Sequence, residues 1–418
     1  MTNKSVLLPL VLFVAPAVHA QVTSRAAEIE AARDLKAQKL AVEQVAPAER
    51  RLLYIREAKI LERFSAGVGG FRAKLGGMVT GGGFGLGPEY LREDLARGEA
   101  LFRASAQRSF KGYYKADLEF GLPSFARDKL FTQFLAVHNN YPGIAYYGRG
   151  PDSQKTGRSA YRIEDTAADG LFGVRPFRYL RLGGTGGYLW VNVGPGTDKL
   201  YISSDRIYGP DQAPGIDRQT NFLRYGGFAQ FDYRDNPLGA RSGGNYTLRF
   251  DRYSDRKIAR FDFDRLEAEV QQFIPFFNKR RVFALRGRTS LTYKDRGQQV
   301  PFYLQPALGG SDDLRGFRTF RFHDDNAMVM NAEYRWESFS GLDMAIFADA
   351  GKVFPRKSQL NFKDLESAVG FGLRFNARNS VFLRIDVGFS HEGFQVWFKF
   401  GNIFGQRPFG SSVPPHIQ

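Results

Sequence analysis

Long runs of alternating apolar and polar residues occupy most of this chain from about residue 66 onward. In one run near the C-terminus, Val381 and Leu383 fall on one face, whereas Arg384 and Asp386 fall on the other. Successive side chains of a β-strand point to opposite faces, so this period of two predicts strands with one apolar and one polar face. Further runs of this kind lie at residues 246–251, 282–293, 328–336 and 394–404.

Three features of these runs favour a membrane-spanning barrel over a soluble sheet. The strands predicted around these runs are about nine to fourteen residues long, which suits a tilted membrane strand, whereas soluble strands average about five or six residues. Tight turns such as 338–341 and 379–380 alternate with long polar loops at 141–157, 196–222 and 294–326. The polar faces are rich in Arg, Lys, Asp and Glu, as expected of a lumen. Because backbone polar groups in lipid need a helix or a closed barrel, we predict an all-β membrane protein, a closed antiparallel transmembrane β-barrel.

The barrel is predicted to occupy residues 66–404. About fourteen segments alternate clearly, and the Gly-rich residues 75–88 are interpreted as one further strand. Bacterial single-chain barrels have an even number of strands, so another strand would come from residues 66–74 or from division of a longer segment. We expect about sixteen strands, with about fourteen as the alternative.

The regions that flank the barrel differ from it in composition. Residues 1–20 combine one Lys, an apolar stretch and a small-residue cleavage site before Gln21, which predicts a signal peptide, with a short buried helix as the alternative. Residues 21–65 are rich in helix-forming residues and predict a short helical periplasmic segment, with a second helix starting near Pro47. Residues 405–418 form a polar C-terminal tail. No apolar run is long enough for a transmembrane helix.

The chain contains no Cys and only five His, and its formal net charge is +16. The lack of Cys excludes disulfides, Cys-ligated metals and thiol nucleophiles, and no His cluster has metal-ligand spacing. We therefore expect neither a metal nor another cofactor. The positive charge is spread over strands and loops without a basic helix, which argues against nucleic-acid binding. An Arg-rich lumen, or loops that face anionic lipopolysaccharide, explains the charge better, so outer-membrane lipid and lipopolysaccharide are the expected partners.

Two short motifs lie in the last third of the chain. The long loop at 294–326 contains the tetrad Leu314, Arg315, Gly316 and Phe317. A second motif lies two predicted strands later. It consists of Phe347, Asp349 and Gly351, which occupy alternate positions of one segment. The last alternating segment ends in aromatic residues, Phe400 and Phe404. Together these features resemble the bacterial surface antigen superfamily, the barrels of BamA, TamA and the two-partner secretion transporters, over residues 68–404.

The resemblance implies a sixth external loop that folds back into the lumen, where Arg315 pairs with Asp349 on the thirteenth strand. It also implies a Gram-negative outer-membrane location, a polypeptide or lipid client, and a terminal-strand signal at Phe400 and Phe404. Larger members carry periplasmic POTRA modules, but residues 21–65 offer no room for one, so the chain is similar to short members that lack them. The resemblance therefore does not decide whether this chain handles a client in the manner of BamA, or whether it has a separate periplasmic partner.

The pair of charges can also be argued from the residues alone. Ala348 and Ala350 face outward by the period of two, so Asp349 points into the lumen. An Arg on a long loop can reach such a carboxylate and bind it with two hydrogen bonds, which tethers the loop and narrows the pore. In the alternative, Arg315 is a solvated loop charge and Asp349 pairs with a lumen neighbour such as Arg335. The other predicted lumen charges are Glu333, Arg335, Arg286 and Arg288.

Three functions are compatible with such a barrel. The first is translocation or insertion of polypeptide or lipid, through the lumen or through a weak seam between the first and last strands. The Gly-rich residues 75–88 favour such a seam, because Gly weakens a strand. The second is a passive, anion-preferring pore for small solutes. The third, a hydrolase, is disfavoured because the adjacent Ser390 and His391 face opposite sides of a strand. We therefore predict no enzyme activity and no catalytic residues.

Overall fold

The computed structural model describes residues 29–35, 68–76, 78–79, 81–377, 380–401 and 404. The chain divides into two compact units, Met1–Tyr54 and Ile55–Gln418. The described residues of the first unit form one short exposed helix at 29–35, within the segment predicted to be helical. The predicted signal peptide, the helix predicted near Pro47 and the predicted tail lie outside the described residues. No helix in the described ranges is long and apolar enough to cross a bilayer.

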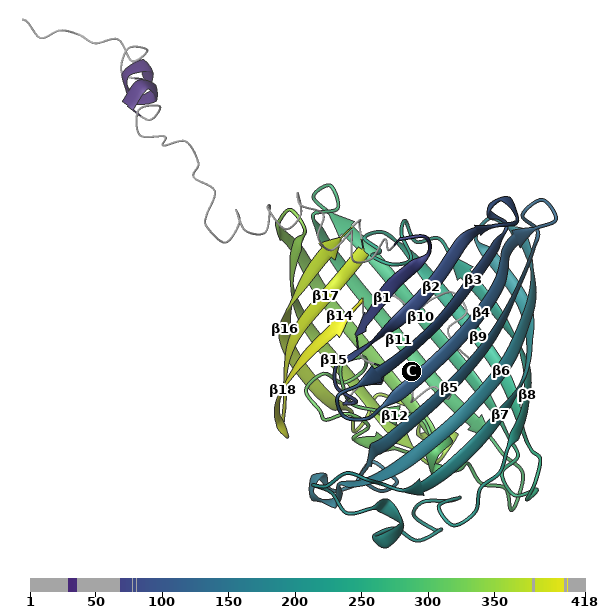
Figure 1. Cartoon of the computed structure of the whole chain (residues 1–418). Coiled ribbons are helices and arrows are strands. Elements are labelled where there is room, and N and C mark those ends of the chain that lie inside the picture. The colour runs from purple at the N-terminus through teal and green to yellow at the C-terminus, as the bar shows by residue number, and fades with distance from the viewer. Residues whose placement is uncertain are drawn as a thin grey trace, which may run out of the picture. The chain divides into compact units, whose positions relative to one another are not determined.

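The second unit is a nearly closed barrel of sixteen antiparallel strands, each paired with its neighbour along the chain (Figure 1). The strands of the wall are β1 (Phe71–Gly76), β2 (Gly85–Leu95), β3 (Ala100–Ser109), β4 (Tyr114–Phe125), β5 (Leu130–Tyr146), β6 (Ser159–Phe177), β7 (Leu180–Pro195), β8 (Phe222–Asp232), β9 (Gly243–Asp255), β10 (Phe263–Phe276), β11 (Arg281–Tyr293), β14 (Asn326–Phe339), β15 (Leu342–Phe354), β16 (Glu366–Ala377), β17 (Ser380–Ser390) and β18 (Gly393–Phe400). The predicted all-β barrel of about sixteen strands is confirmed, and the alternative of fourteen is wrong.

The connections between strands hold smaller elements. A separate hairpin of β12 (Ala307–Leu308) and β13 (Phe322–His323) lies between β11 and β14. Short 3-10 helices are η1 (Ala96–Gly98), η2 (Lys155–Gly157), η3 (Ser204–Arg206), η4 (Phe302–Leu304) and η5 (Lys357–Gln359).

The first two strands differ from the prediction. The sequence predicts one strand over residues 75–88, but the structure divides this segment between the end of β1, a connection and the start of β2. Gly81 and Gly83 have φ values of +89° and +82°, a left-handed conformation that Gly adopts without strain and that ends a strand. The Gly-rich composition therefore marks a loop between two strands.

The strands place apolar side chains outside the barrel and charged side chains inside it. Phe371 and Phe398 face outward and are 53% and 67% exposed, whereas Arg374 and Asp386 face inward and are completely buried. A water-soluble protein would bury the first pair and expose the second. The inverted arrangement suits a wall with lipid outside and a polar lumen inside.

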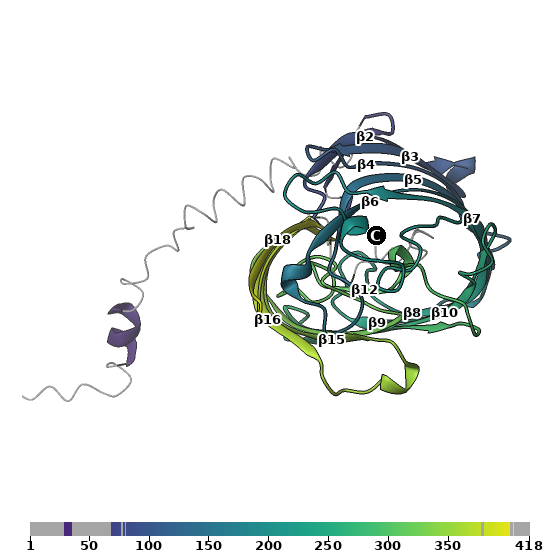
Figure 2. The ribbon, with the colours of Figure 1, turned by 90° about the horizontal axis from the view of Figure 1, so that it is seen from below.

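The two ends of the barrel differ in the length of their connections. At one end, turns of a few residues join the strands, as between β14 and β15. At the other end, the connections at 147–158, 196–221 and 294–325 are long and fold over the barrel mouth (Figure 2). Buried aromatic rings pack these connections against the barrel wall, with Phe302 of the last connection 4.7 Å from Tyr161 of β6 between ring centroids. Protein therefore fills much of the long-loop end.

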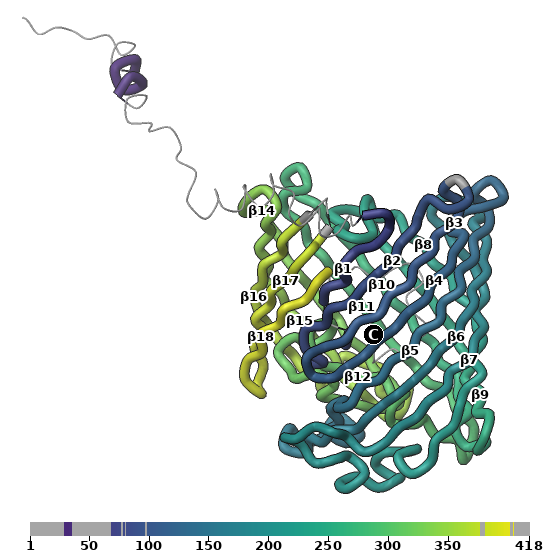
Figure 3. Tube along the Cα trace, in the orientation of Figure 1, coloured from purple at the N-terminus to yellow at the C-terminus, as the bar shows by residue number. Residues whose placement is uncertain are grey.

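The strands β1 and β18 are the two edges of the sheet and lie side by side (Figure 3). In the described residues, the ladder of paired strands runs from β1 to β18 without joining these two to each other. Across the junction, Phe84 of the connection between β1 and β2 approaches Phe400 of β18, with 6.0 Å between ring centroids. We call this junction the seam. A strand edge without a partner offers its backbone hydrogen-bonding groups to another strand.

The last strand ends earlier than the sequence predicts. The strand β18 stops at Phe400 instead of Phe404, because Gly401 has a φ of +91° and turns the chain away from the sheet. The ring of Phe404 is completely buried on the lumen side, 5.8 Å from the ring of Phe273 and 4.9 Å from the guanidinium of Arg335. Burial of such a side chain stabilises a fold by about 1.5–3 kcal/mol. Of the predicted terminal-strand signal, only Phe400 therefore lies on the last strand.

Candidate functional site

The long connection between β11 and β14 sends its loop tip, residues 311–317, against the lumen face of the wall. At the centre of the loop tip, Arg315 is completely buried. Its Nε donates to Asp349 Oδ2 at 2.8 Å, and its Nη2 donates to Asp349 Oδ1 at 2.7 Å. The backbone N–H of Arg315 donates to the same carboxylate at 3.1 Å. The pair is bidentate, which is the geometry in which a guanidinium binds a carboxylate most strongly.

A second carboxylate also contacts the loop arginine. The Nη1 of Arg315 forms an ion pair with Glu333 of β14. Burial alone would lower the pKa of Arg315, but Asp349 and Glu333 outweigh that effect and hold the pKa above its usual value. Arg315 therefore stays charged while buried, and the position of the loop tip depends on these two acceptors.

A network of buried ion pairs surrounds this contact. Glu333 pairs with Arg335 at 2.6 Å and with Arg374 at 2.9 Å, and Arg374 pairs with Asp386 at 2.6 Å. Both carboxylate oxygens of Asp349 accept hydrogen bonds from Arg315. The structure therefore does not show the alternative in which Asp349 pairs with Arg335. Asp386 also lies 3.6 Å from Arg384, and Arg384 pairs with Asp312 of the loop tip at 2.5 Å. The loop arginine is therefore one member of a network of ion pairs that joins the loop tip to the wall.

The motif on β15 supports the loop tip and the strand pairing beside it. Phe347 places its ring under the guanidinium of Arg315, with the centroid 3.4 Å from Cζ, a cation–π contact. Asp349 accepts the bidentate hydrogen bonds. A Cβ on Gly351 would lie 2.6 Å from Met328 O, so a larger residue there would push apart β14 and β15. Each position of the motif therefore has its own structural role.

The apolar residues of the loop motif are buried beside Arg315. Leu314 and Phe317 are completely buried in a cluster with Val329 of β14 and Val353 of β15. The ring centroid of Phe317 lies 5.3 Å from that of Phe322. The loop tip is therefore anchored by apolar packing as well as by charge.

The backbone of the loop tip approaches β17 so closely that two positions suit only glycine. A Cβ on Gly388 would lie 2.4 Å from Arg315 O. A Cβ on Gly316 would lie 2.7 Å from Phe389 O. Both distances are shorter than a van der Waals contact between carbon and oxygen, so a side chain at either position would displace the loop tip.

The last strand contacts the loop tip directly. The indole Nε1 of Trp397 donates to Arg315 O at 2.8 Å. On the same strand, Lys399 Nζ lies 3.2 Å from Asp312 Oδ2. Because β18 borders the seam, the loop tip is bonded to a seam strand as well as to the lumen wall.

The other predicted lumen charges contact the same loop. Arg286 Nη1 donates to Asp312 O at 2.9 Å, and Arg288 Nη2 pairs with Asp313 Oδ1 at 2.7 Å. The predicted site residues other than the terminal aromatics are thus brought together around one loop tip.

Several side chains that contact the loop tip, or the carboxylates that bind it, are not identified by the sequence. They are Asn331, Arg374, Arg384, Asp386, Ser390 and Trp397. Arg384 Nη2, for example, donates to Ser311 O at 2.8 Å, and Ser390 Oγ donates to Gly316 O at 2.8 Å. The period of two places several of them on the polar face of a strand. It does not indicate which strands meet the loop.

Solved barrels share this fold. BamA from Haemophilus ducreyi lacking POTRA domains 1–3 matches with a TM-score of 0.58 and 14% identity, over 80% of this chain and 70% of that chain. CdiB from Escherichia coli matches with a TM-score of 0.54 and 13% identity, over 79% of this chain but only 62% of that chain. Identities this low establish a shared fold and no shared activity. A comparison with curated proteins finds no match.

The sequence itself matches one family. The Omp85 superfamily domain matches residues 97–404, well over half of the chain, and the matched range includes both motifs. The predicted resemblance is therefore confirmed, and the described residues contain no POTRA-like region. The chain belongs to the Omp85 superfamily, whose barrels lie in the outer membrane of Gram-negative bacteria.

Proposed function

We propose that this barrel translocates or inserts polypeptide or lipid at the outer membrane, and that the loop tip is a tether that keeps the resting barrel closed. The observation that carries the proposal is that one loop tip bonds both the lumen wall, through Asp349, and the seam strand β18, through Trp397. Membership of the superfamily is consistent with a translocation or insertion role.

The orientation of the barrel follows from the lengths of its connections. Outer-membrane barrels have short periplasmic turns and long external loops. The long connections, including the one that carries the loop tip, are therefore external. A client that arrives from the periplasm meets the short-turn end and the adjacent end of the seam.

The seam offers a route that a fully paired barrel lacks. An unpaired strand edge can accept an extended segment of another chain, because main-chain hydrogen bonds supply much of the affinity. At the seam, β1 is only six residues long, and the ladder does not join it to β18. These features support entry or exit of a client between the first and last strands.

The alternative of a passive, anion-preferring pore has less support. An Arg-rich lumen attracts anions only where its guanidinium groups are not compensated. Arg103 pairs with Asp117 at 2.9 Å and Arg224 with Asp169 at 2.7 Å, in addition to the pairs around the loop tip. The loop tip also takes up part of the lumen cross-section.

We also propose that the barrel has no enzyme activity of its own. Ser390 Oγ donates to Gly316 O, and His391 Nδ1 lies 3.3 Å from Glu366. The two side chains therefore have separate partners and do not form a nucleophile–base pair. A hydrolytic site would need the serine to donate to the histidine.

A reversible cross-link of the seam tests the proposed route. A Cβ built on Gly76 lies 3.6 Å from Phe400 Cβ, within the span of about 3.5–4.5 Å that a disulfide needs. The chain has no Cys of its own, so the double variant G76C/F400C forms one defined bridge. Two rates are measured in liposomes, the insertion of an unfolded small β-barrel and the flipping of a fluorescent phospholipid. The oxidised double variant is expected to raise these rates about tenfold less than the wild type does, because the bridge removes the open state.

The controls separate the bridge from the substitutions. Gly76 has a φ of +135°, so the single variant G76C measures the effect of backbone strain alone. Reduction of the bridge should restore the double variant to the level of the two single variants. Full activity of the oxidised protein in both assays would exclude the seam as the route.

A further inference from the structure

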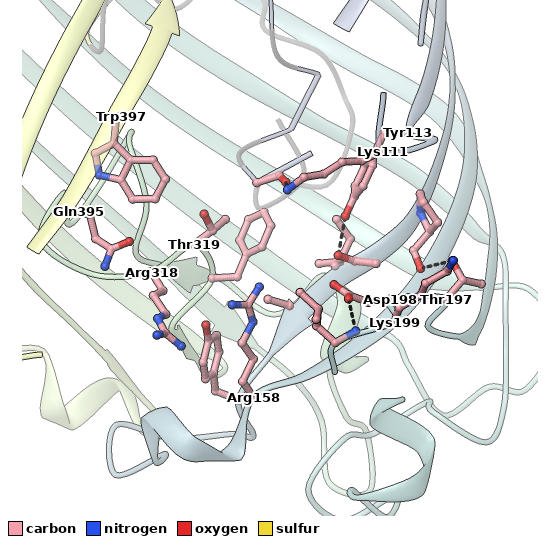
Figure 4. Close-up of a pocket in the computed structure, with 18 residues that line it drawn as sticks. Lys111, Tyr113, Arg158, Thr197, Asp198, Lys199, Arg318, Thr319, Gln395 and Trp397 are labelled. Carbon is pink, nitrogen blue, oxygen red and sulfur yellow. Dashed lines mark hydrogen bonds between the residues drawn. The ribbon is translucent and has the colours of Figure 1, made fainter. Parts of the chain in front are cut away.

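A cavity of about 640 Å³ lies at the external end of the barrel, beside the seam (Figure 4). Its walls come from the connections that follow β1, β3, β5 and β7, from the end of β5, from the segment after the loop tip, and from β18. Apart from Trp397, its residues take no part in the tether described above. Its volume falls within the range of about 300–1,000 Å³ that is usual for small-molecule sites.

Four cations and one carboxylate line this cavity. They are Lys111, Arg158, Lys199, Arg318 and Asp198. In the part of the chain that the structure describes, none of the four cations has a carboxylate within ion-pair distance, in contrast to the paired arginines around the loop tip. Asp198 Oδ1 accepts a hydrogen bond from the backbone N–H of Leu200 at 2.9 Å. The cavity therefore presents an excess of three positive charges.

Two of the cations are held in place by neighbouring groups. The guanidinium of Arg158 stacks on the ring of Tyr201, 3.7 Å from its centroid, and its Nη1 donates to Tyr201 OH at 2.7 Å. Lys111 Nζ donates to Gly81 O at 3.1 Å. Neither contact neutralises a charge. Both reduce the entropy that the side chain would lose when it binds an anion.

The uncharged walls suit a sugar ring. Trp397 and Gln395 lie on one side of the cavity in Figure 4, and Lys111 and Tyr113 lie on the other. Aromatic rings pack against the apolar C–H face of a sugar, while amide and hydroxyl groups such as those of Gln395 and Thr319 can bond its hydroxyls. An ordinary carboxylate ligand would use only part of the positive charge, whereas a phosphate monoester carries a charge of about −1.5 to −2 at neutral pH.

We infer that this cavity binds a phosphorylated sugar, with the phosphate among Lys111, Arg158, Lys199 and Arg318 and the ring beside Trp397. Two sources share this chemistry, a phosphorylated sugar of the lipopolysaccharide headgroup and a free sugar phosphate. The ligand contacts the connections that follow β3, β5 and β7, the segment after the loop tip, and β18. It therefore joins β18, on one side of the seam, to loops of the strands on the other side, at the external end of the barrel. This site stands independently of the proposed translocation.

Titration calorimetry on the full chain, refolded in detergent, tests the site with glucosamine 1-phosphate as the probe. We expect glucosamine 1-phosphate to bind. Glucosamine and inorganic phosphate should each bind with an affinity at least about tenfold lower, because each lacks one set of contacts. The variants K111Q, K199Q and R318Q should each weaken binding about tenfold, since each removes one charge-assisted hydrogen bond. The matched control is K257Q, which removes an exposed lysine at the same end of the barrel but outside the cavity.

Competition with lipopolysaccharide distinguishes the two sources. Displacement of glucosamine 1-phosphate by lipopolysaccharide, but not by its dephosphorylated form, would support the site and assign the lipid headgroup. Binding of the sugar phosphate without displacement would support the site and assign a free ligand. The inference is overturned by no binding of any probe, by equal affinity for inorganic phosphate, or by variants that are folded and bind like K257Q.

Discussion

Replacement of Arg315 by alanine should raise the open probability of the barrel in a planar bilayer and lower its level in the outer membrane. The variant leaves Asp349 and Glu333 buried with one partner fewer each. Removal of one partner of a buried ion pair typically costs about 3–5 kcal/mol. The loop tip also loses its bidentate contact and its cation–π contact with Phe347. A loop tip without these contacts no longer stays docked against the wall.

Two further variants define what this experiment measures. Arg315→Lys keeps the charge but loses the bidentate geometry, so it should give an intermediate open probability. Arg103→Ala is the matched control, because Arg103 is a buried lumen arginine that pairs with Asp117 and Glu119 of β4, far along the chain from the loop tip. Arg103→Ala should lower stability without opening the pore. Unchanged conductance and normal membrane levels of Arg315→Ala would contradict the tether.

Replacement of Gly388 by valine should open the barrel as strongly as the loss of Arg315, although it removes no charge. A Cβ at this position would lie 2.4 Å from Arg315 O and 2.5 Å from Arg315 C, so the loop backbone must move. Overpacking of this kind costs about 1–3 kcal/mol or more, and displacement of the loop tip is the easiest relief. The measurement is again the open probability in a planar bilayer.

The control for this variant is Gly287→Val on β11. A Cβ on Gly287 would meet no atom within 4 Å, so the substitution tests the general effect of valine in a strand. Wild-type conductance is expected for Gly287→Val. If Gly388→Val also had wild-type conductance, close docking of the loop tip would not be what keeps the barrel closed.

The barrel wall could be predicted because its physical signal is local. In residues 383–386, the alternation of Leu383 and Ile385 with Arg384 and Asp386 already gives the two faces that the structure shows. The expected outward position of Val381 is wrong, because the register shifts at this end of β17 and Val381 is buried. The same local pattern misleads at residues 75–88. There a Gly-rich segment reads as a weak strand, and only the positive φ values of Gly81 and Gly83 reveal a loop.

The candidate site could be predicted only in part, because most of its contacts join distant segments. The pair of Arg315 and Asp349 follows from the motifs and the period of two. The contact of Trp397 with the loop tip depends on how β17 and β18 are placed against it, which no local pattern encodes. The burial of Phe404 also depends on distant residues, since its ring packs against Phe273 of β10.

The bonds from β18 to the loop tip make two events thermodynamically dependent on each other. Trp397 and Lys399 bond the loop tip from the strand whose edge borders the seam. A client that pairs with this edge and shifts the strand would weaken both bonds and so favour release of the loop tip. Coupling between equilibria is reciprocal, so release of the loop tip would raise the affinity of the seam for the client by the same factor. Such a barrel would be cooperative. Binding of a client at the seam would itself favour release of the loop tip, so no additional ligand would be needed to open the barrel.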